Sequence, residues 1–298
     1  MNHTTQDKDN WDLVIEAKSP LFRLNFREIW HYRDLLMLLV MRDYKASFKQ
    51  TILGPVWFFI QPLLTSSVYA VIFGMIAKLG TDGNPRLLFY MSGVILWNYF
   101  STCLNSSANT FISNANIFGK VYFPRLIMPL SIVFSNFLRF SVQFLFFGVT
   151  WAYYFLQGQI SFQLSWVVLL TPVFLVIMAV LGLSMGLIVS SLTTKYRDLT
   201  HLIGFGVQLM MYATPVVYAS SSLPERWQQL IQYNPMTAVI EGFRYAFLGS
   251  GTFNPQMLLY SLTITTILFF ISVILFNKVE TGFMRTVSQN HHVIAFFK

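Results

Sequence analysis

Residues 164–192 read LSWVVLLTPVFLVIMAVLGLSMGLIVSSL, an apolar stretch without a single charged residue. A helix of about 20 apolar residues crosses the hydrocarbon core of a bilayer, which is about 30 Å thick. The same kind of stretch recurs along the chain at about 56–77, 87–104, 130–156, 202–218 and 257–276. The sequence therefore predicts an all-α integral membrane protein with six transmembrane helices.

The composition excludes an ordinary soluble protein. Of the 298 residues, 55% are hydrophobic and 11% are charged, and the mean hydropathy is +0.55. An average soluble domain has about a quarter of its residues charged. The net charge of +8 resides mostly in short segments between apolar runs, without a basic patch interleaved with aromatic residues, so we expect no nucleic-acid partner. The single cysteine, Cys103, excludes an intrachain disulfide and a cysteine-based metal cluster.

The lysines and arginines predict the orientation in the membrane. Six spans place both ends of the chain on one side, and fifteen of the twenty Lys and Arg residues fall in segments on that side, against four on the other. Because short cytoplasmic segments are enriched in these residues, both termini are expected in the cytoplasm. Residues 1–10 are polar and acidic and lack the features of a cleaved signal peptide, in agreement with a cytoplasmic start.

These patterns divide the chain into four parts. We expect a polar tail over 1–18, a cytoplasmic amphipathic interface region over 19–55, the transmembrane domain over 56–280, and a cytoplasmic tail over 281–298.

The region before the first span predicts a helix that lies on the membrane surface. Ser19-Pro20 has the residue types of a helix N-cap followed by proline at the first helical position. Behind it, one helical face gathers Phe22, Phe26, Ile29 and Trp30. Such a face suits the cytoplasmic surface of the bilayer, and the alternative is a helix packed on a soluble partner.

Residues 223–254, between the last two spans, are too apolar for an ordinary surface loop. They are also too polar for a full span, and Pro235, Gly242 and Gly249 interrupt them. Unsatisfied backbone groups are costly in lipid, so a short helical hairpin that dips into the membrane from outside fits this segment best.

The chain carries no recognisable catalytic or nucleotide-binding motif. It has no phosphate-cradling GxxxxGK[ST] loop and no HExxH, GxSxG or CxxC motif, and the predicted spans contain no Asp or Glu. Catalysis in the membrane and proton-coupled transport both require ionisable groups near the spans. We therefore assign no catalytic residue, metal site or cofactor to this chain and expect its driving force to come from elsewhere.

Arg139 is the exception inside the third predicted span. Asn136 and Gln143 share its helical face, at three residues before and four after. A charge at such a depth costs at least ~2.5 kcal/mol, and no predicted span offers a carboxylate to neutralise it. Its partners must be amides, backbone carbonyls, water, or a phosphate from lipid or substrate; alternatively, the side chain extends to one interface from a tilted helix.

Polar residues at helical spacing mark two other spans. The first span carries Gln61, Thr65 and Tyr69, and the predicted fifth carries His201, Gly204, Gln208 and Met211. Such stripes either join helices to one another or line a pathway, and both interpretations stay open.

Two further spacings indicate helix contacts. Gly182, Gly186 and Ser190 follow close-packing spacing on the fourth span. Glu241 and Arg244 lie three apart, which indicates a local ion pair, with a gating role as the alternative.

Several motifs, in order along the chain, resemble one family. They are RDYK at 42–45, KQTILGPVW at 49–57 followed by QP at 61–62, NIFGKVYFPR at 116–125, YRD at 196–198, and NPM at 234–236 followed by EGFR at 241–244. Together they resemble the permease subunits of ABC exporters of the polysaccharide-export type, over about residues 20 to 280.

This resemblance implies a homodimer in the cytoplasmic (inner) membrane of a bacterium. It also implies two copies of a separate ATP-binding subunit, which would hold ATP and Mg, and a glycan substrate linked to a lipid pyrophosphate. Contact with the ATPase would involve Arg42, Lys49, Asn116, Gly119, Lys120, Tyr122, Pro124, Arg125, Arg197 and Asp198.

The resemblance further implies that the first and fifth spans line the channel, which makes candidates of Gln61, Thr65, Tyr69, Gln208 and Met211. Residues 223–248 would gate the outer mouth, with candidates Pro235, Glu241 and Arg244.

Three alternatives differ in what they predict. A drug or small-lipid exporter would share the fold but not the glycan-type motifs. A membrane glycosyltransferase or ligase that acts on lipid-linked sugars needs acidic residues at a membrane surface, where Glu241 is the lone external candidate near a span. A passive channel would function without an ATPase.

Overall fold

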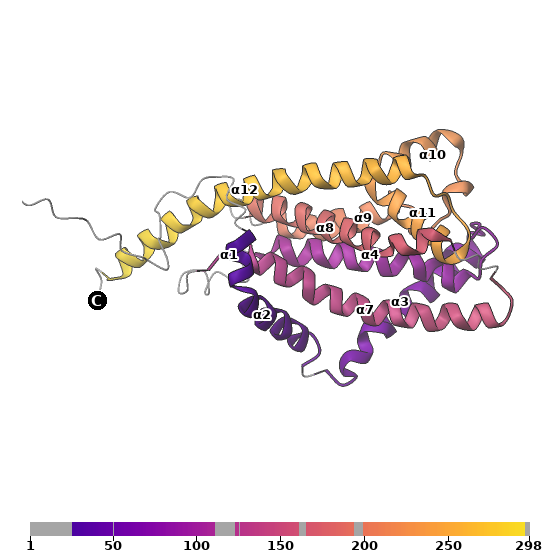
Figure 1. The fold of residues 1–298 in the computed structure, drawn as a ribbon, viewed down its shortest axis with the longest axis horizontal. Helices are drawn as coiled ribbons and strands as arrows, with labels where there is room; N and C mark the ends of the chain where they lie inside the picture. Colours follow the sequence, from indigo (N-terminus) through magenta and orange to yellow (C-terminus); the bar gives the residue numbers. More distant parts are fainter. Residues whose placement is uncertain are drawn as a thin grey trace, which may run out of the picture.

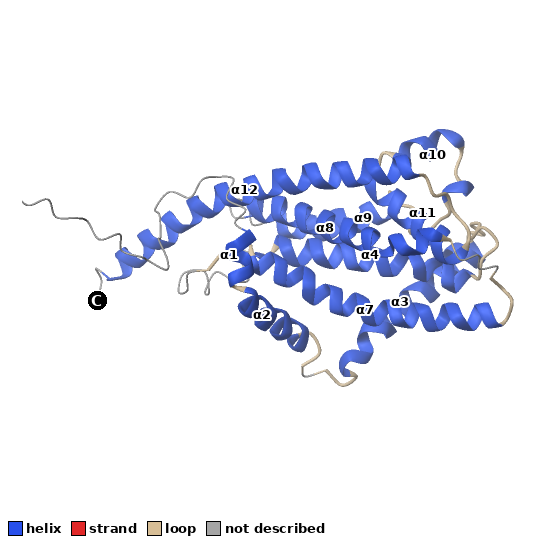
Figure 2. Ribbon diagram, in the orientation of Figure 1, coloured by secondary structure: helices blue, strands red, loops and turns tan. Residues whose placement is uncertain are grey.

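The computed structural model describes residues 26–49, 51–110, 123–124, 126–160, 165–193 and 199–295. This part of the chain is helical and contains no strand (Figure 2). The α-helices are α1 Phe26–His31, α2 Arg33–Ala46, α3 Trp57–Tyr69, α4 Arg86–Ala108, α7 Ile127–Leu156, α8 Thr171–Thr193, α9 Leu199–Tyr212, α10 Glu225–Gln232, α11 Pro235–Leu248 and α12 Pro255–Ala295. The long helices lie side by side along one axis, with α1 and α2 near one end of the bundle, the α2 end, and α10 at the other, the α10 end (Figure 1).

Five segments are long and apolar enough to cross a bilayer. They are Gly54–Ile76, Arg86–Ala108, Ile127–Leu156, Trp166–Thr193 and Pro255–Val279. These segments coincide with five of the six predicted spans, and their bounds differ from the predicted ones by a few residues. The first combines a 3-10 turn, α3 and a π-helical segment over Ala70–Ile76.

The helix in the predicted fifth span, 202–218, is shorter than predicted. This helix is α9, Leu199–Tyr212, whose 14 residues extend about 21 Å at 1.5 Å per residue. That is shorter than the ~30 Å hydrocarbon core. The helix ends where Pro215 follows, because proline has no N–H to continue the ladder and disfavours helical geometry in the residue before it.

Helix α4 lies at the centre of the bundle and packs against α3, α7, α8 and α11. The closest approach is to α8, where a Cβ added to Gly186 would lie 2.5 Å from Ser107 Cβ and 2.7 Å from the Leu104 carbonyl oxygen. Gly182 has the same role one turn earlier, with the Phe100 carbonyl 2.7 Å from its added Cβ. The predicted close-packing spacing is therefore confirmed.

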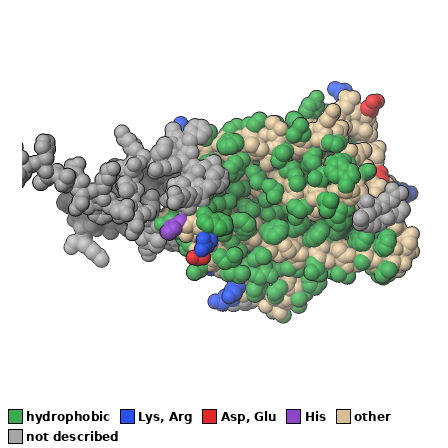
Figure 3. Space-filling model, viewed as in Figure 1, with side chains coloured by type: hydrophobic (Ala, Val, Ile, Leu, Met, Phe, Trp, Pro, Cys, Tyr) green, Lys and Arg blue, Asp and Glu red, His purple; other side chains and the backbone are tan. Residues whose placement is uncertain are grey.

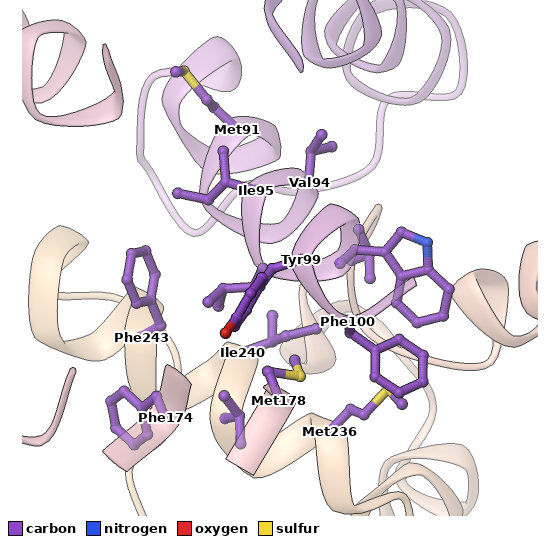
Figure 4. Close-up of a cluster of buried hydrophobic side chains, with 14 of the residues drawn as sticks. Met91, Val94, Ile95, Tyr99, Phe100, Phe174, Met178, Met236, Ile240 and Phe243 are labelled. Carbon is purple, nitrogen blue, oxygen red and sulfur yellow. The ribbon is translucent and has the colours of Figure 1, made fainter. Parts of the chain in front are cut away.

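The core is a continuous apolar cluster in which α4, α8 and α11 contribute most residues and α7 and α9 contribute a few. Figure 4 shows Met91 and Ile95 of α4 above Phe174 and Met178 of α8, with Phe100 of α4 lower, near Met236 of α11. In lipid, packing and helix contacts rather than hydrophobic burial hold helices together, so this dense core provides much of the cohesion of the fold.

Apolar side chains also cover the outside of the bundle. Figure 3 shows hydrophobic residues over its middle and charged residues gathered toward its two ends. Leu145 on α7, Leu169 before α8 and Val176 on α8 are among the exposed ones. Such a belt suits contact with lipid tails.

The region before the first span contains two helices. The predicted start at Ser19-Pro20, and Phe22, lie outside the described residues. Helix α1 presents Trp30, whose side chain is 69% exposed. Helix α2 buries Leu39 against Phe123, Ile127 and other residues at the α2 end.

The predicted helical pair in residues 223–254 is present as α10 and α11. Asn234 caps α11 by accepting a 3.0 Å hydrogen bond from the Met236 N–H, and Pro235 occupies the first helical position. Gly249, with a φ of 66°, ends the helix in the left-handed conformation that glycine adopts readily. Most of α11 is buried against α4, α8 and α12.

The last helix is longer than the predicted sixth span. Helix α12 continues without interruption from Pro255 to Ala295, about 60 Å at 1.5 Å per residue. It runs along the bundle and extends past the α2 end (Figure 1). The division predicted at residue 280 therefore does not coincide with the end of a helix.

Candidate functional site

Three of the ten residues predicted to contact an ATPase belong to the described part. Arg42, on α2, pairs with the neighbouring Asp43, with Nη2 2.7 Å from Oδ1. Lys49 is exposed in the turn that follows α2, and the Pro124 carbonyl accepts a 3.0 Å hydrogen bond from the N–H of Ile127, the first residue of α7. The other seven lie outside the described residues: Asn116, Gly119, Lys120, Tyr122, Arg125, Arg197 and Asp198.

The described ends of two predicted contact segments meet in one small core. Leu39 of α2 packs in the same buried cluster as Phe123 and Ile127, at the beginning of α7. Arg42, Lys49 and the segment that leads into α7 therefore share the α2 end of the bundle.

The predicted channel residues divide into buried and exposed positions. The Tyr69 hydroxyl on α3 lies 3.7 Å from the sulfur of Met211 on α9, so these two residues join the helices within one chain. Thr65 donates its hydroxyl to the Gln61 carbonyl one turn earlier on α3. The side chains of Gln61 and Gln208 are exposed on the surface of the single chain, which leaves them available to a pathway or to a second subunit.

Arg139 lies twelve residues into α7, about 18 Å along the helix from its beginning. Its Nη2 donates a 3.5 Å hydrogen bond to the Asp43 backbone carbonyl, and its guanidinium carbon lies 5.9 Å from the centre of the Phe58 ring. Asn136 and Gln143 line the same cavity as Arg139, so the predicted shared face is confirmed. A backbone carbonyl is one of the partner types expected for this arginine.

Glu241 and Arg244 form a buried cluster on α11. Their closest atoms, Oε1 and Nη1, are 3.5 Å apart, and Arg244 is 1% exposed. The Arg244 guanidinium also donates to the Val216 carbonyl at 2.8 Å and to the Tyr218 carbonyl at 3.1 Å. Its carbon lies 3.8 Å from the centre of the Phe89 ring. The predicted ion pair is confirmed, and it fastens the segment after α9 to the bundle.

The carboxylate of Glu241 is fully engaged. Oε1 accepts a 2.8 Å hydrogen bond from the Ser220 hydroxyl, and Oε2 accepts one of 3.4 Å from the Thr252 N–H. Gly251 approaches closely, because an added Cβ would lie 2.8 Å from Oε2. A carboxylate held on both oxygens, beside a guanidinium, is poorly suited to act as a general acid or base.

Sequence reasoning missed the residues that complete this cluster. Gly93 of α4 allows the close approach, since a Cβ there would lie 2.7 Å from the Val216 carbonyl and 3.1 Å from Arg244 Nη2. Phe89, one turn earlier, provides the ring under the guanidinium. A glycine and a phenylalanine in the apolar first half of α4 carry no signal that distinguishes them from ordinary packing residues.

Within the described ranges, no three His, Cys, Asp or Glu side chains come together as a candidate metal site. In the same part of the chain, the buried or half-buried polar groups include amides, hydroxyls, the Glu241 carboxylate and two arginines, Arg139 and Arg244. Amides, hydroxyls and guanidinium groups bind and orient a polar or anionic ligand.

Comparisons with known proteins match most of the chain. Residues 34–248 match the family model of the ABC-2 type transporter. The chain is 30% identical over 250 residues to the O-antigen export system permease protein RfbA of Klebsiella pneumoniae. The matched region covers 84% of this chain and 93% of that protein. The chain is also 26% identical over 263 residues to a protein of the same name from Myxococcus xanthus, covering 88% and 98%.

A third relative is named for the transport of a different polymer. The chain is 20% identical over 254 residues to the polysialic acid transport protein KpsM of Escherichia coli, with 83% of this chain and 93% of that protein covered. All three relatives are named for export or transport.

Proposed function

The chain belongs to the ABC-2 type transporter family, and on this basis we propose that it is the transmembrane subunit of an ATP-driven exporter of lipid-linked polysaccharide. The observation that carries the proposal is the similarity, over 84% of the chain, to a permease named for O-antigen export. The similarity to a polysialic acid transport protein supports a polysaccharide as the wider substrate class. The substrate is then an O-antigen, a capsule polymer or a teichoic-acid-like polymer.

The driving force comes from a separate ATP-binding subunit, present in two copies that hold ATP and Mg. The absence of a phosphate-binding loop from the sequence supports this division of labour. Contact is made at the α2 end, through Arg42, Lys49, Pro124 and the predicted contact residues outside the described part. When ATP closes the two partner subunits, they push on these short segments and part the permeases.

The α2 end faces the cytoplasm of a bacterial cell, and the α10 end faces outward across the inner membrane. The excess of Lys and Arg in segments on the α2 side supports this orientation. Helix α9, with the turn segment that follows it, forms the fifth of six crossings, although the helix alone extends only about 21 Å. The helices α10 and α11 dip into the membrane from outside and gate the outer mouth of the pathway. Pro235, Glu241 and Arg244 of α11 are the candidate residues of this gate.

Two copies of the chain enclose the pathway between their α3 and α9 helices. Gln61 on α3 and Gln208 on α9 are exposed in the single chain. The same helices expose apolar residues, among them Leu64 and Phe205, at 56% and 63%. A homodimer would cover these apolar residues and turn the glutamines toward a polar path for sugar.

Affinity purification of the tagged chain from its native membrane tests this proposal. An ATPase with a GxxxxGK[ST] motif should co-purify with it, and ATP hydrolysis by that subunit should depend on the chain. An unrelated membrane protein that carries the same tag serves as the control. Export that continues unchanged in cells that lack the ATPase would contradict the proposal.

A further inference from the structure

Arg139 lies at the junction of two cavities that form a polar groove between α2, α3, α4 and α7. The cavities have volumes of about 580 and 300 Å³, and both are lined by Ser47, Asn136 and Arg139. We call this space the Arg139 groove.

The wall of the groove on α4 is a row of amides and hydroxyls. Asn98 and Thr102 line one cavity, and Asn105 and Asn109 line the other. Their spacing of four, three and four residues places them on one helical face. A polar stripe of this length on a central transmembrane helix serves either helix contacts or a ligand. Because these residues line cavities, a ligand is favoured.

The groove carries one positive charge that its own residues do not neutralise. Its charged lining residues are Arg42, Asp43 and Arg139. The Asp43 carboxylate is taken by Arg42, at 2.8 Å from Nε and 2.7 Å from Nη2. Among the described residues, the hydrogen bond that Arg139 makes goes to the backbone carbonyl of Asp43, at 3.5 Å, and the two arginines and one carboxylate together leave one net positive charge in the space.

The donors of Arg139 are incompletely used. A guanidinium has five N–H donors in a planar fork. Among the described residues, buried Nε has no hydrogen-bond partner, and the Phe58 ring at 5.9 Å adds only a weak attraction. An arginine with unused donors, surrounded by amides, matches the oxygens of a phosphate, which it binds through two parallel hydrogen bonds.

The surroundings of the groove are apolar. Met41 precedes Arg42 on α2 and Trp57 precedes Phe58 on α3, and both side chains are exposed. A ligand that enters here from the membrane can leave an apolar chain against such residues while its charged head reaches Arg139. A free inorganic phosphate has no apolar part that could contact these residues, whereas a phosphate ester on a lipid has one.

From these observations we propose that the Arg139 groove binds the phosphate head of an anionic lipid. Two lipids carry this chemistry: a resident membrane phospholipid, and the pyrophosphate carrier of the exported glycan. Only the second source rests on the proposed function.

Equilibrium binding to the purified full-length chain in detergent micelles tests the proposal. The probes are radiolabelled polyprenyl diphosphate, phosphatidylglycerol, and a polyprenol without phosphate. We expect Arg139→Gln to weaken binding of at least one phosphate probe tenfold or more, while Arg139→Lys, which keeps the charge but loses the fork, retains part of the affinity. The matched control Arg226→Gln, at an exposed arginine on α10, should stay within twofold of the unmodified chain.

A second variant keeps Arg139 and fills the groove. Ser106 lines the larger cavity, so Ser106→Phe should lower phosphate-probe binding tenfold or more with the arginine intact. This variant is used for the test if size-exclusion chromatography shows that Arg139→Gln is not folded.

The outcomes separate the two lipid sources. A loss of both phosphate probes identifies a general anionic-lipid site, and a loss of the diphosphate alone identifies a site for the substrate carrier. The proposal is overturned if a folded variant binds both phosphate probes as the unmodified chain does, or if the unmodified chain binds neither phosphate probe more tightly than the polyprenol. The assay needs no ATPase, so a failure of the proposed exporter function would leave this result readable.

Discussion

Replacing Arg244 with methionine removes the centre of the buried cluster on α11 while it keeps a side chain of similar length. The change eliminates two hydrogen bonds to backbone carbonyls, of 2.8 Å to Val216 and 3.1 Å to Tyr218. It also leaves the Glu241 carboxylate without its cationic neighbour at 3.5 Å. The segment after α9 then loses the hydrogen bonds that fasten it to α11.

The magnitude follows from burial. Removal of one partner from a buried ion pair costs about 3–5 kcal/mol, because the remaining charge is left uncompensated. The two hydrogen bonds to backbone carbonyls have a charged donor, and each contributes about 1.5–3 kcal/mol. These contributions are not added to the cost of breaking the ion pair, because the same groups take part in both. We therefore expect Arg244→Met to destabilise the fold by about 3–5 kcal/mol, which at 2–4 °C per kcal/mol lowers the Tm by at least about 6 °C.

Thermal unfolding of the purified protein in detergent measures this effect. The matched control is Arg226→Met on α10, where the side chain is exposed and a change within about 0.5 kcal/mol is expected. The double variant Glu241→Gln with Arg244→Met removes the stranded charge and should recover on the order of 1–2 kcal/mol relative to the single variant. Equal Tm values for Arg244→Met and Arg226→Met, or no recovery in the double variant, would refute the structural role of this ion pair.

Three further substitutions test other parts of the account. Gly186→Val should destabilise the fold by about 3 kcal/mol, because the added side chain would collide with atoms of α4. The control Gly148→Val places its side chain in open space and should leave the Tm nearly unchanged. Similar Tm values for the two variants would contradict the close packing of α4 and α8. Trp151→Phe loses a 2.7 Å hydrogen bond to a backbone carbonyl of α11 and should cost about 1 kcal/mol in thermal unfolding, and an unchanged Tm would argue against that bond. Arg125→Ala or Gly119→Trp should uncouple ATP hydrolysis from export without loss of membrane insertion, as measured by parallel ATPase and export assays, and unchanged export in both would remove the case for coupling through that segment.

Much of the architecture follows from hydropathy alone. A backbone in lipid must satisfy its own hydrogen bonds, so each long apolar stretch becomes a helix, and five of the six predicted spans have the expected length. The remaining one, the predicted fifth span, has the shorter helix α9 because Pro215 interrupts the apolar stretch, and average hydropathy over a window does not register a single proline.

The candidate sites were predictable along each helix but not across helices. Helical spacing placed Asn136 and Gln143 on the face of Arg139, and it paired Glu241 with Arg244. The Asp43 carbonyl that Arg139 contacts is 96 positions away in the chain, and local periodicity says nothing about such a neighbour.

The amide row on α4 is a different case. Asn98, Thr102, Asn105 and Asn109 share one helical face by their spacing, so the row is predictable from the sequence. The cavities that the row lines are not predictable in this way, because they depend on how α2, α3 and α7 pack around α4.

Reconstitution into liposomes tests the central claim most directly. The purified chain is inserted with and without its ATP-binding partner, and the transfer of a lipid-linked glycan across the bilayer is followed by its accessibility to a lectin that does not cross the membrane. We predict transfer only when both subunits and hydrolysable ATP are present. Full transfer by this chain alone, in the absence of ATP, would contradict the account.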